Sequence, residues 1–482
     1  MALFASGLWS VNVCLDPSHP LVVGWAGDDD PENPRNWPLW RINVNAGLLT
    51  FLAFLIPLGS TIIAPGVPQI MEGFQNSSPE LAAFVLSIFI FATAFGPLFF
   101  SPLSEIYGRL IMYHIANVGF VASNVACALS PTLESLIFFR FLAGFFGSCP
   151  ITNGAASIAD MAPPETRGKF MGAFAVGPLL GPVIGPAIAG FVNEALGWRW
   201  VFWVVSAASA ATTVIVFLFC RETYAPVLLQ RRVRRLREST GNPMLRHMLD
   251  DGLTPWDQIR RAIVRPLKLL FLSPIGFISA LYLAIVYGYL YIMFSTMPAV
   301  FARQYHITGS IAGLTYLGLG VGSLLGVMTF SLFSNHAIKK IASDGKELKP
   351  EVRFRIAPLG ALALPVGLFL YGWSADRGAH WIVPIIGMAV VGIANVVLFM
   401  SICLYLVDCF ELYSASALAA NTVMRSIGAG LLPLVGVRMI DTLGIGWGHS
   451  LMGFIAVAMI PIPFLFLRFG EFLRRRFEFT SL

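Results

Sequence analysis

Long apolar segments separated by short polar connections dominate the pattern of this sequence, and the few charged residues gather between the segments. A run of roughly 20 apolar residues is the length of helix that crosses the hydrocarbon core of a bilayer. The runs are too long and too uniformly apolar for barrel strands, whereas a helix pairs its own backbone groups in lipid. The pattern therefore predicts an all-α membrane protein.

Twelve transmembrane helices are expected, in two bundles of six. The expected spans are 43–64, 81–102, 110–130, 134–158, 170–192, 200–220, 271–297, 309–333, 355–374, 380–406, 415–437 and 448–468. The longest hydrophilic connection divides them six and six, as in transporters that rock two repeats about a central site. The expected organisation is an N-terminal tail (1–41), an N-terminal bundle (42–220), a basic linker (221–270), a C-terminal bundle (271–468) and a C-terminal tail (469–482).

The composition agrees with lipid as the solvent and argues against several function classes. Hydrophobic residues make up 56% of the chain, charged residues only 12%, and the mean hydropathy is +0.74. The seven histidines are scattered, so they supply no converging cluster for a membrane-embedded enzyme. The chain shows no Walker motif for ATP-driven export and no selectivity filter typical of a channel. We expect no cofactor and no metal, and we interpret the six cysteines as small apolar residues.

The placement of basic residues predicts the orientation in the membrane. Lys and Arg concentrate in the linker, in the loop 334–354 and in the C-terminal tail. Because excess positive charge marks the cytoplasm, both termini are expected there, with the plasma membrane as the expected location and the vacuolar membrane as the alternative. Asn76, in the sequence Asn76-Ser77-Ser78, is a candidate glycosylation site in the first outside loop. The basic run 231–237 faces anionic lipid in this interpretation and does not bind nucleic acid.

The fifth and eighth spans carry glycines at every fourth residue. The fifth span contains Gly177, Pro178, Gly181, Pro182, Gly185 and Pro186, and the eighth contains Gly318, Gly322 and Gly326. Repeated proline removes N–H donors, so such a helix is tolerated in a membrane only when it packs against protein. Glycines at this spacing form one bare stripe that allows two backbones to approach closely. We favour a sliding contact between the two halves, and packing within each half is the alternative.

Two charged motifs in the N-terminal half are candidates for function. The connection after the second span reads Ser101-Pro102-Leu103-Ser104-Glu105-Ile106-Tyr107-Gly108-Arg109, in which Gly108 supplies a tight turn. These charges either face a helix end and a partner, or only set the topology. Arg140 lies inside the fourth span, where an arginine tends to face a cavity or a partner. A snorkelling anchor is the alternative for Arg140.

These motifs, together with three other stretches, resemble the fungal twelve-span form of the drug:H+ antiporter branch of the major facilitator superfamily. The other stretches are Asp30-Pro31-Glu32-Asn33-Pro34-Arg35-Asn36-Trp37, Glu222-Thr223-Tyr224-Ala225-Pro226 and the second-half set from Gly372-Trp373 to Tyr413, Asn421 and Arg425. The resemblance covers nearly the whole chain from Asp28 onward. It departs from the family pattern at Ser101, where a glycine is usual, and at Leu110, where a second basic residue is usual.

The resemblance implies a secondary transporter that exports small organic molecules, such as a drug, toxin or secondary metabolite, in exchange for protons. The glycine-proline motif resembles the antiporter signature that uptake symporters generally lack, and a proton-coupled uptake symporter of the same fold is the alternative. The family loop latches the cytoplasmic side, which implies a latch formed by Glu105, Gly108 and Arg109, with Asp160 and Arg167 as partners. We expect a monomer surrounded by membrane lipid.

The candidate substrate cavity combines Arg140 with residues of the seventh and eleventh spans. Arg425 lies near the middle of the eleventh span without an acidic residue on its face, and Asn421 lies one turn before it. Arg425 therefore faces the cavity, an anionic substrate group, or backbone carbonyls. Tyr287 and Tyr291 are candidates for an aromatic wall, although tyrosines 287, 289 and 291 spread around the helix and some are expected to face lipid. No Asp or Glu lies near the middle of a span, so a peripheral carboxylate or the substrate itself carries the proton.

Overall fold

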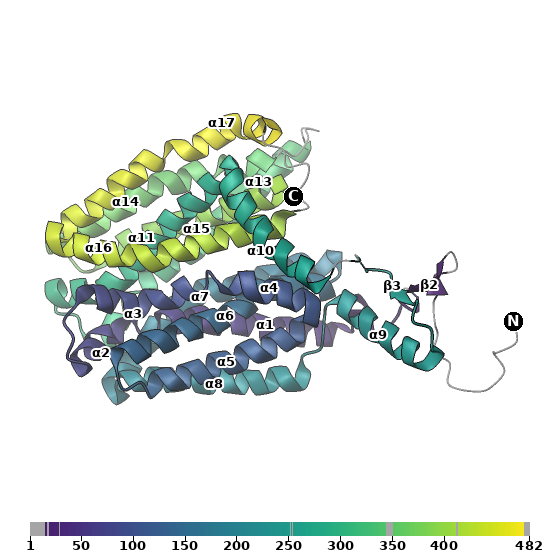
Figure 1. Cartoon of the computed structure of the whole chain (residues 1–482). Coiled ribbons are helices and arrows are strands. Elements are labelled where there is room, and N and C mark those ends of the chain that lie inside the picture. Colours follow the sequence, from purple (N-terminus) through teal and green to yellow (C-terminus); the bar gives the residue numbers. More distant parts are fainter. Residues whose placement is uncertain are drawn as a thin grey trace, which may run out of the picture.

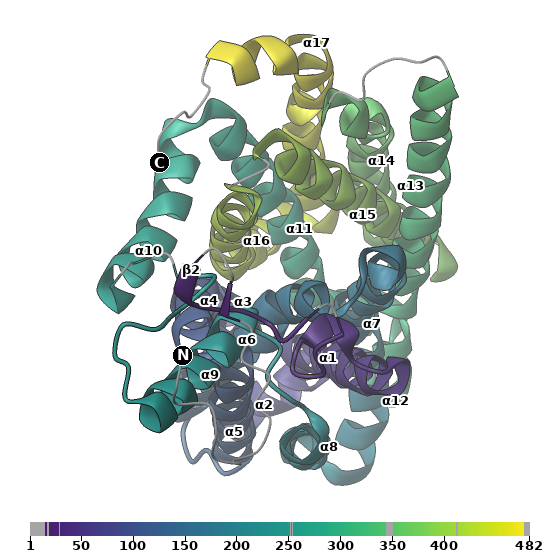
Figure 2. The same ribbon diagram turned by 90° about the vertical axis from the view of Figure 1, so that its right-hand side faces the viewer.

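Two helical bundles lie side by side in the computed structural model, and a separate layer of helix and strand extends from one end of them (Figure 1). The structure describes residues 15–16, 19–27, 29–250, 252, 254–343, 350–410 and 413–476. We call the end that carries α9 and the strands the linker end, and the opposite end the far end. Figure 2 shows the molecule from the linker end, with the two bundles facing each other across one interface.

The N-terminal bundle contains the spans predicted for the first half of the chain. Its helices are α1 (Leu39–Thr61), α2 (Val67–Gly73), α3 (Pro79–Ala92), α4 (Gly96–Tyr107), α5 (Arg109–Ala128), α6 (Leu133–Met161), α7 (Pro164–Leu196) and α8 (Trp198–Phe219). α3 and α4 belong to one span, and α2 extends the first. Local signals place several helix starts: the Ser78 hydroxyl accepts a bond from the Leu81 N–H, and Thr132 forms a capping box with Ser135.

The C-terminal bundle contains α11 (Pro274–Tyr305), α12 (Gly309–Leu314), α13 (Leu317–Ser343), α14 (Ala357–Asp376), α15 (Ile382–Phe410), α16 (Ser414–Met459) and α17 (Pro461–Arg476). Within the described residues, eleven segments are long and apolar enough to cross a membrane, and the last of them runs 61 residues from Ser414 to Arg474. At ~1.5 Å per residue such a segment is roughly three times the thickness of a bilayer core. Gly444 interrupts it with φ 82° and ψ 167°. It therefore supplies two spans, and the prediction of about twelve membrane helices is confirmed.

The connection between the bundles is folded, which the sequence did not indicate. It contains α9 (Ala225–Thr240) and α10 (Pro255–Leu272), and between them the short strand β3 (Arg246–His247). β3 pairs in parallel with β2 (His19–Val23), which pairs antiparallel with β1 (Leu15–Asp16). The predicted class of all-α membrane protein is confirmed, and these short strands are an addition outside the membrane helices. Strands this short form through pairing between distant segments, so they leave no alternating pattern in the sequence.

The glycine stripe of α7 packs inside the N-terminal bundle, against α1. A Cβ atom built on Gly177 lies 2.9 Å from the Thr50 carbonyl oxygen, and one on Gly181 lies 2.6 Å from that of Phe54. Gly185 approaches the Leu58 carbonyl in the same way, at 2.8 Å. The predicted sliding contact between the halves is therefore wrong for this stripe. Spacing at i, i+4 and i+8 identifies a face of a helix but not the neighbour that covers it.

The second stripe is also internal to its own bundle. Cβ atoms built on Gly318 and Gly322 would clash with Ile385 and Ala389 of α15, and one on Gly326 lies 3.0 Å from the Ile393 carbonyl oxygen. The contact between the halves uses other glycines. Gly190 of α7 faces Ser310, Gly313 of α12 faces Pro186, and Gly320 of α13 faces Val183, so α7 contacts the C-terminal bundle through a different side.

The prolines of α7 leave helix carbonyls without their usual partners, and α1 supplies one replacement. Pro186 has no N–H to donate to the carbonyl of Pro182, which lies four residues earlier. The Thr61 hydroxyl of α1 donates to this carbonyl at 3.1 Å. This bond explains how a proline-rich helix persists here, because an unpaired carbonyl is strongly destabilising in a lipid environment.

We predict that Gly181→Ala destabilises the protein by about 1–3 kcal/mol, because the added methyl group meets backbone atoms of α1 that have no room to shift. The measurement is thermal unfolding of the detergent-solubilised protein. Gly172→Ala on the same helix is the matched control, since a Cβ there has nothing within 4 Å. Equal melting temperatures for the two variants would contradict the close packing of α1 and α7.

Candidate functional site

Arg140 lies fully buried in the N-terminal bundle, where backbone carbonyls satisfy its guanidinium group. Its Nη1 and Nη2 atoms donate to the carbonyls of Gly59 and Ser60 at 2.7 and 2.8 Å. Longer bonds reach Val85 and Leu86 of α3. Gly59 and Ser60 lie in the last turn of α1, where carbonyls lack helical partners and positive charge is favoured. Arg140 is therefore not a snorkelling anchor.

Polar side chains connect the two bundles close to Arg140. The Ser60 hydroxyl lies 3.3 Å from the Tyr291 hydroxyl of α11, and the Thr93 hydroxyl donates to Ser426 of α16 at 3.0 Å. Beside these bonds, Gly430 of α16 allows close approach to Phe91 of α3. Arg140 binds the carbonyl of Ser60, and the predicted cavity residue Tyr291 lies beside the hydroxyl of Ser60. Ser60 therefore connects these two residues at the interface between the bundles.

Arg425 lies on the C-terminal side of this interface, beside two aromatic rings that contact each other. Its Cζ atom is 4.6 Å from the centre of the Tyr287 ring and 5.1 Å from that of Phe399. Asn421, one turn earlier on α16, is 2% exposed, and its Oδ1 atom has no hydrogen-bond partner. In the part of the chain that the structure describes, neither Arg425 nor Arg140 forms an ion pair. The predicted combination of Arg425, Asn421 and Tyr287 is therefore brought together.

The tyrosines of α11 do not face lipid, contrary to expectation. Tyr282, Tyr289 and Tyr291 are between 2% and 4% exposed, and Tyr287 is half-buried. The spread of these residues around the helix suggested a lipid-facing side. However, α11 contacts α16, α10, α15 and α14 in its own half and α3 in the other half, so most of its circumference is covered by protein.

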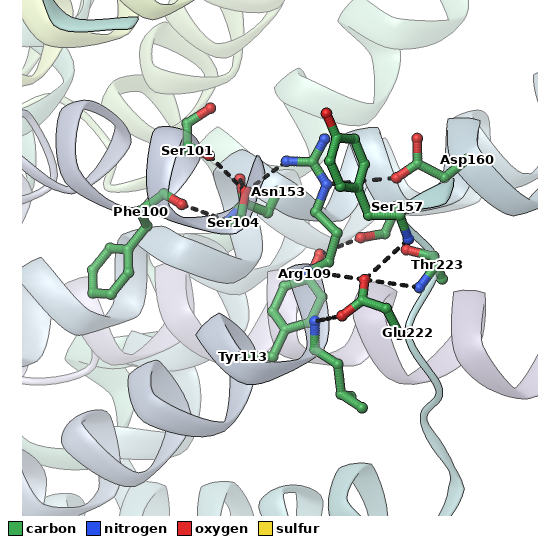
Figure 3. Close-up of polar contacts among 12 residues, drawn as sticks. Phe100, Ser101, Ser104, Arg109, Tyr113, Asn153, Ser157, Asp160, Glu222 and Thr223 are labelled. Carbon is green, nitrogen blue, oxygen red and sulfur yellow. Dashed lines mark hydrogen bonds and ion pairs between the residues drawn. The ribbon is translucent and has the colours of Figure 1, made fainter. Parts of the chain in front are cut away.

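At the linker end, Arg109 organises a polar cluster, shown in Figure 3. Its Nη1 atom donates to the Ser104 hydroxyl at 2.6 Å, and its Nε atom lies 3.5 Å from the Asp160 carboxylate. The face of the guanidinium group lies 4.7 Å from the Tyr224 ring centre. The structure therefore brings together two of the residues that the resemblance implied, Arg109 and Asp160. We call these four residues and Glu222 the Arg109 cluster.

Two of the predicted latch residues lie outside these contacts. The Arg167 Nη2 atom donates to the carbonyl of Ala159 at 3.2 Å and forms no ion pair with Asp160 in the described structure. Glu105 is exposed and lines a pocket of about 550 Å³, together with Arg265 of α10 and Ser416 of α16. Glu105 thus faces the seam between the bundles, whereas Arg167 supports the turn between α6 and α7.

Sequence reasoning missed the role of Glu222, the second acidic residue of the cluster besides Asp160. Its carboxylate accepts bonds from the N–H groups of Arg109 and Leu110 at 3.0 and 3.1 Å, and it therefore caps the start of α5 (Figure 3). The same carboxylate accepts a bond from the N–H of Thr223 at 3.0 Å. Gly108 has φ 104°, and a Cβ there would clash with Glu222. The sequence signal for this cap was an acidic residue two positions after the predicted span 200–220. Glu222 entered the prediction only through the family resemblance.

Two pockets lie along the seam, one at each end of the first of the two spans of α16, which Gly444 separates. The pocket at the linker end reaches α16 at Tyr413 to Ala419, and a pocket of about 390 Å³ at the far end reaches it at Val437 to Ile445. Arg425 lies between these two stretches on the same helix. Asn76 lines the far-end pocket, and its Oδ1 atom accepts a bond from the Ser78 N–H at 2.9 Å. Its glycosylation stays a prediction.

The sequence model of the Major Facilitator Superfamily matches residues 49–433 of the chain. This match spans both bundles and the connection between them. The chain belongs to the major facilitator superfamily. It is a multi-pass membrane transporter, and similar fungal proteins are named as transporters or efflux pumps, not as enzymes.

Several fungal members of the superfamily are similar over almost the whole chain. The MFS-type transporter tndD of Aspergillus flavipes is 50% identical, over 96% of this chain and 87% of its own length. The MFS-type transporter penM of Penicillium rubens is 47% identical, over 94% and 90%. The efflux pump radE of Floropilus chiversii is 44% identical, over 96% and 88%.

Solved structures support the same fold at low identity. The xylose transporter XylE from E. coli, in a partially occluded inward-open conformation, matches with a TM-score of 0.65 and 18% identity. The match covers 89% of this chain and 98% of XylE. At this level of identity the likeness shows the major facilitator fold alone.

We predict that Glu222→Ala loosens the start of α5 and lowers the free energy of unfolding by about 1–3 kcal/mol, because two N–H groups lose a charged acceptor. The measurement is hydrogen exchange of residues 104–112 together with thermal unfolding. Glu238→Ala is the matched control, because Glu238 forms only an exposed pair with Arg234. Unchanged exchange at the start of α5 in Glu222→Ala would show that the cap is not needed.

Proposed function

We propose that this superfamily member exports small organic molecules from the cytoplasm by alternating access, in exchange for protons. The observation that carries the proposal is the position of the two pockets, which lie on the seam between the bundles, one on each side of Arg425 along α16. Backbone contacts at glycines hold α1 to α7 and α13 to α15, and α7 meets α12 of the other bundle in the same way, whereas near the centre the seam is crossed by the hydrogen bonds Ser60–Tyr291 and Thr93–Ser426. Two rigid bundles joined in this way are able to rock about the central residues.

Export rather than uptake is supported by the relatives and by α7. One relative is named an efflux pump, and the glycine-proline helix resembles the antiporter signature. In our proposal the linker end faces the cytoplasm and the protein lies in the plasma membrane as a monomer. The pocket at the linker end then receives the substrate, and the pocket at the far end releases it.

We propose Asp160 as the carboxylate that responds to protons. Arginine does not release its proton in a protein, so Arg109, Arg140 and Arg425 are not the carriers. Asp160 is paired with Arg109 at 3.5 Å. Protonation of Asp160 removes its negative charge and weakens this pair, which would couple a proton at the cytoplasmic side to the Arg109 cluster and the latch.

The decisive experiment uses inside-out vesicles that contain the protein, so that an exporter fills the vesicle lumen. A panel of small aromatic compounds, each offered as the carboxylic acid and as its primary amide, is quantified by mass spectrometry. We expect accumulation of at least one compound when the lumen is acidic, and loss of that accumulation when nigericin collapses the pH gradient. Accumulation that persists after collapse would contradict proton exchange, and uptake only into right-side-out vesicles would favour the symporter.

A further inference from the structure

The two central arginines are in different chemical situations. The charge of Arg140 is fully buried and held by four backbone carbonyls of α1 and α3. Arg425 is half-buried, its guanidinium group lies beside the adjacent rings of Tyr287 and Phe399, and it shares a hydrogen bond with the Tyr287 hydroxyl. Cation–π contacts use the faces of a guanidinium, whereas its N–H donors point outward in the plane of the group. Of the two central arginines, Arg425 is therefore the one that keeps N–H donors for a ligand.

The surroundings of Arg425 favour a negative partner. A charge near the middle of a membrane span is strongly destabilised unless a partner compensates for it. Within the described residues, no Asp or Glu forms an ion pair with Arg425 or Arg140, so positive charge predominates at the centre. A carboxylate fits the fork of an arginine through two parallel hydrogen bonds. An ammonium group would be repelled.

We infer that the transporter recognises its substrate as an anion, through a carboxylate or an acidic phenol or enol that binds Arg425. This inference rests on the export proposed above and specifies its substrate class. Tyr287 and Phe399 would contact the apolar body of the substrate, and Asn421, with its unpartnered Oδ1 atom, would accept a hydroxyl or N–H group. A flat aromatic acid combines all of these features.

The test compares Arg425→Gln with the wild type in the vesicle assay, using each aromatic acid and its amide. We expect acid transport to fall about 10- to 100-fold, because a charged hydrogen-bonding pair is lost, while amide transport changes less than threefold. Arg438→Gln is the matched control, since Arg438 is exposed on the same helix. Arg425→Lys should restore part of the acid transport.

Each result separates the inference from the proposed function. If acid and amide transport fall equally in Arg425→Gln, while the protein is monodisperse and correctly inserted, Arg425 maintains the architecture and the anion inference is wrong. The inference is also overturned if the wild type transports amides or amines but not acids, in which case export itself still stands. If no compound accumulates in either vesicle orientation, the proposed export fails for small aromatic acids and amides.

A second observation, independent of the centre, concerns the N-terminal tail at the linker end. The Asp30 carboxylate accepts bonds from the Arg232 Nη1 atom of α9 and from the Ala26 N–H, both at 2.7 Å. A third bond comes from the Glu32 N–H at 2.9 Å. Burial raises the pKa of Asp30, but these hydrogen bonds and the charge of Arg232 outweigh burial and hold it below its ordinary value. Asp30 is therefore ionised at cytoplasmic pH.

The same tail also fastens the chain that follows α9. Val22 and Val23 of β2 pair with Arg246 and His247 of β3, and the Met248 N–H donates to the Val23 carbonyl at 3.1 Å. A small apolar cluster supports the pairing, formed by Val23, Val233, Leu236 and Leu245. The linker is therefore attached to the N-terminal tail as far as Met248. Beyond it, α10 packs on α11 and α16 of the C-terminal bundle and also contacts α4 of the N-terminal bundle.

We propose that this clasp, formed by residues 22–27 and 29–32 with α9 and β3, limits how far the bundles separate at the linker end. The chain between Met248 and the start of α10 at Pro255 is short, and fully extended it spans at most about 25 Å. Without the clasp, the free connection would begin nearer the end of α9 at Thr240 and would be about twice as long. The clasp thus sets the reach of the opening movement.

The test is Asp30→Asn, measured by hydrogen exchange of residues 244–248 and by the spin-label distance between α9 and α10. We expect at least tenfold faster exchange and a broader distance distribution. Arg232→Gln should reproduce both effects, and Glu238→Gln, on the exposed side of α9, should show neither. If Asp30→Asn and Arg232→Gln leave both measurements unchanged, the clasp does not restrain the linker.

Discussion

Main-chain polar groups that lack a helical partner determine much of this structure, because lipid offers them no water. Three separate features answer this one constraint. Thr61 satisfies the carbonyl exposed by Pro186, Arg140 satisfies the carbonyls at the end of α1, and Glu222 satisfies the N–H groups at the start of α5. In each case a side chain from another segment completes a helix. The bundle is therefore held by polar bonds at helix ends and kinks as well as by apolar packing.

The centre of the seam differs from the interior of each bundle, although toward the far end α7 meets α12 as closely as it meets α1. Within a bundle, glycines let backbones meet, so α7 approaches α1 at distances that leave no room for a methyl group. Across the seam, hydroxyl pairs such as Ser60–Tyr291 are able to exchange partners with water or a ligand at little energetic loss. The proposed rocking movement would take place at this interface, which contains Arg140 and Arg425.

The sequence predicted the parts of the structure that depend on local pattern. Long apolar runs gave the membrane helices, and the family resemblance gave the pairing of Arg109 with Asp160. The neighbours of the glycine stripes, the cap at Glu222 and the strand pairing of Val23 were not predictable, since each depends on a segment far away in the chain. Periodicity identifies which face of a helix is special, but only the fold identifies its partner.

The two central arginines show that the surroundings of a residue determine its role. Both are intramembrane cations, and the sequence placed both in the substrate cavity. Arg140 lies where the end of α1 presents free carbonyls, so its charge serves the N-terminal bundle. Arg425 lies in the interior of α16, where the helix satisfies its own carbonyls and the nearest groups are the rings of Tyr287 and Phe399. Its charge therefore needs a partner from outside the helix, and in the proposed export cycle a substrate that passes along the seam would supply it.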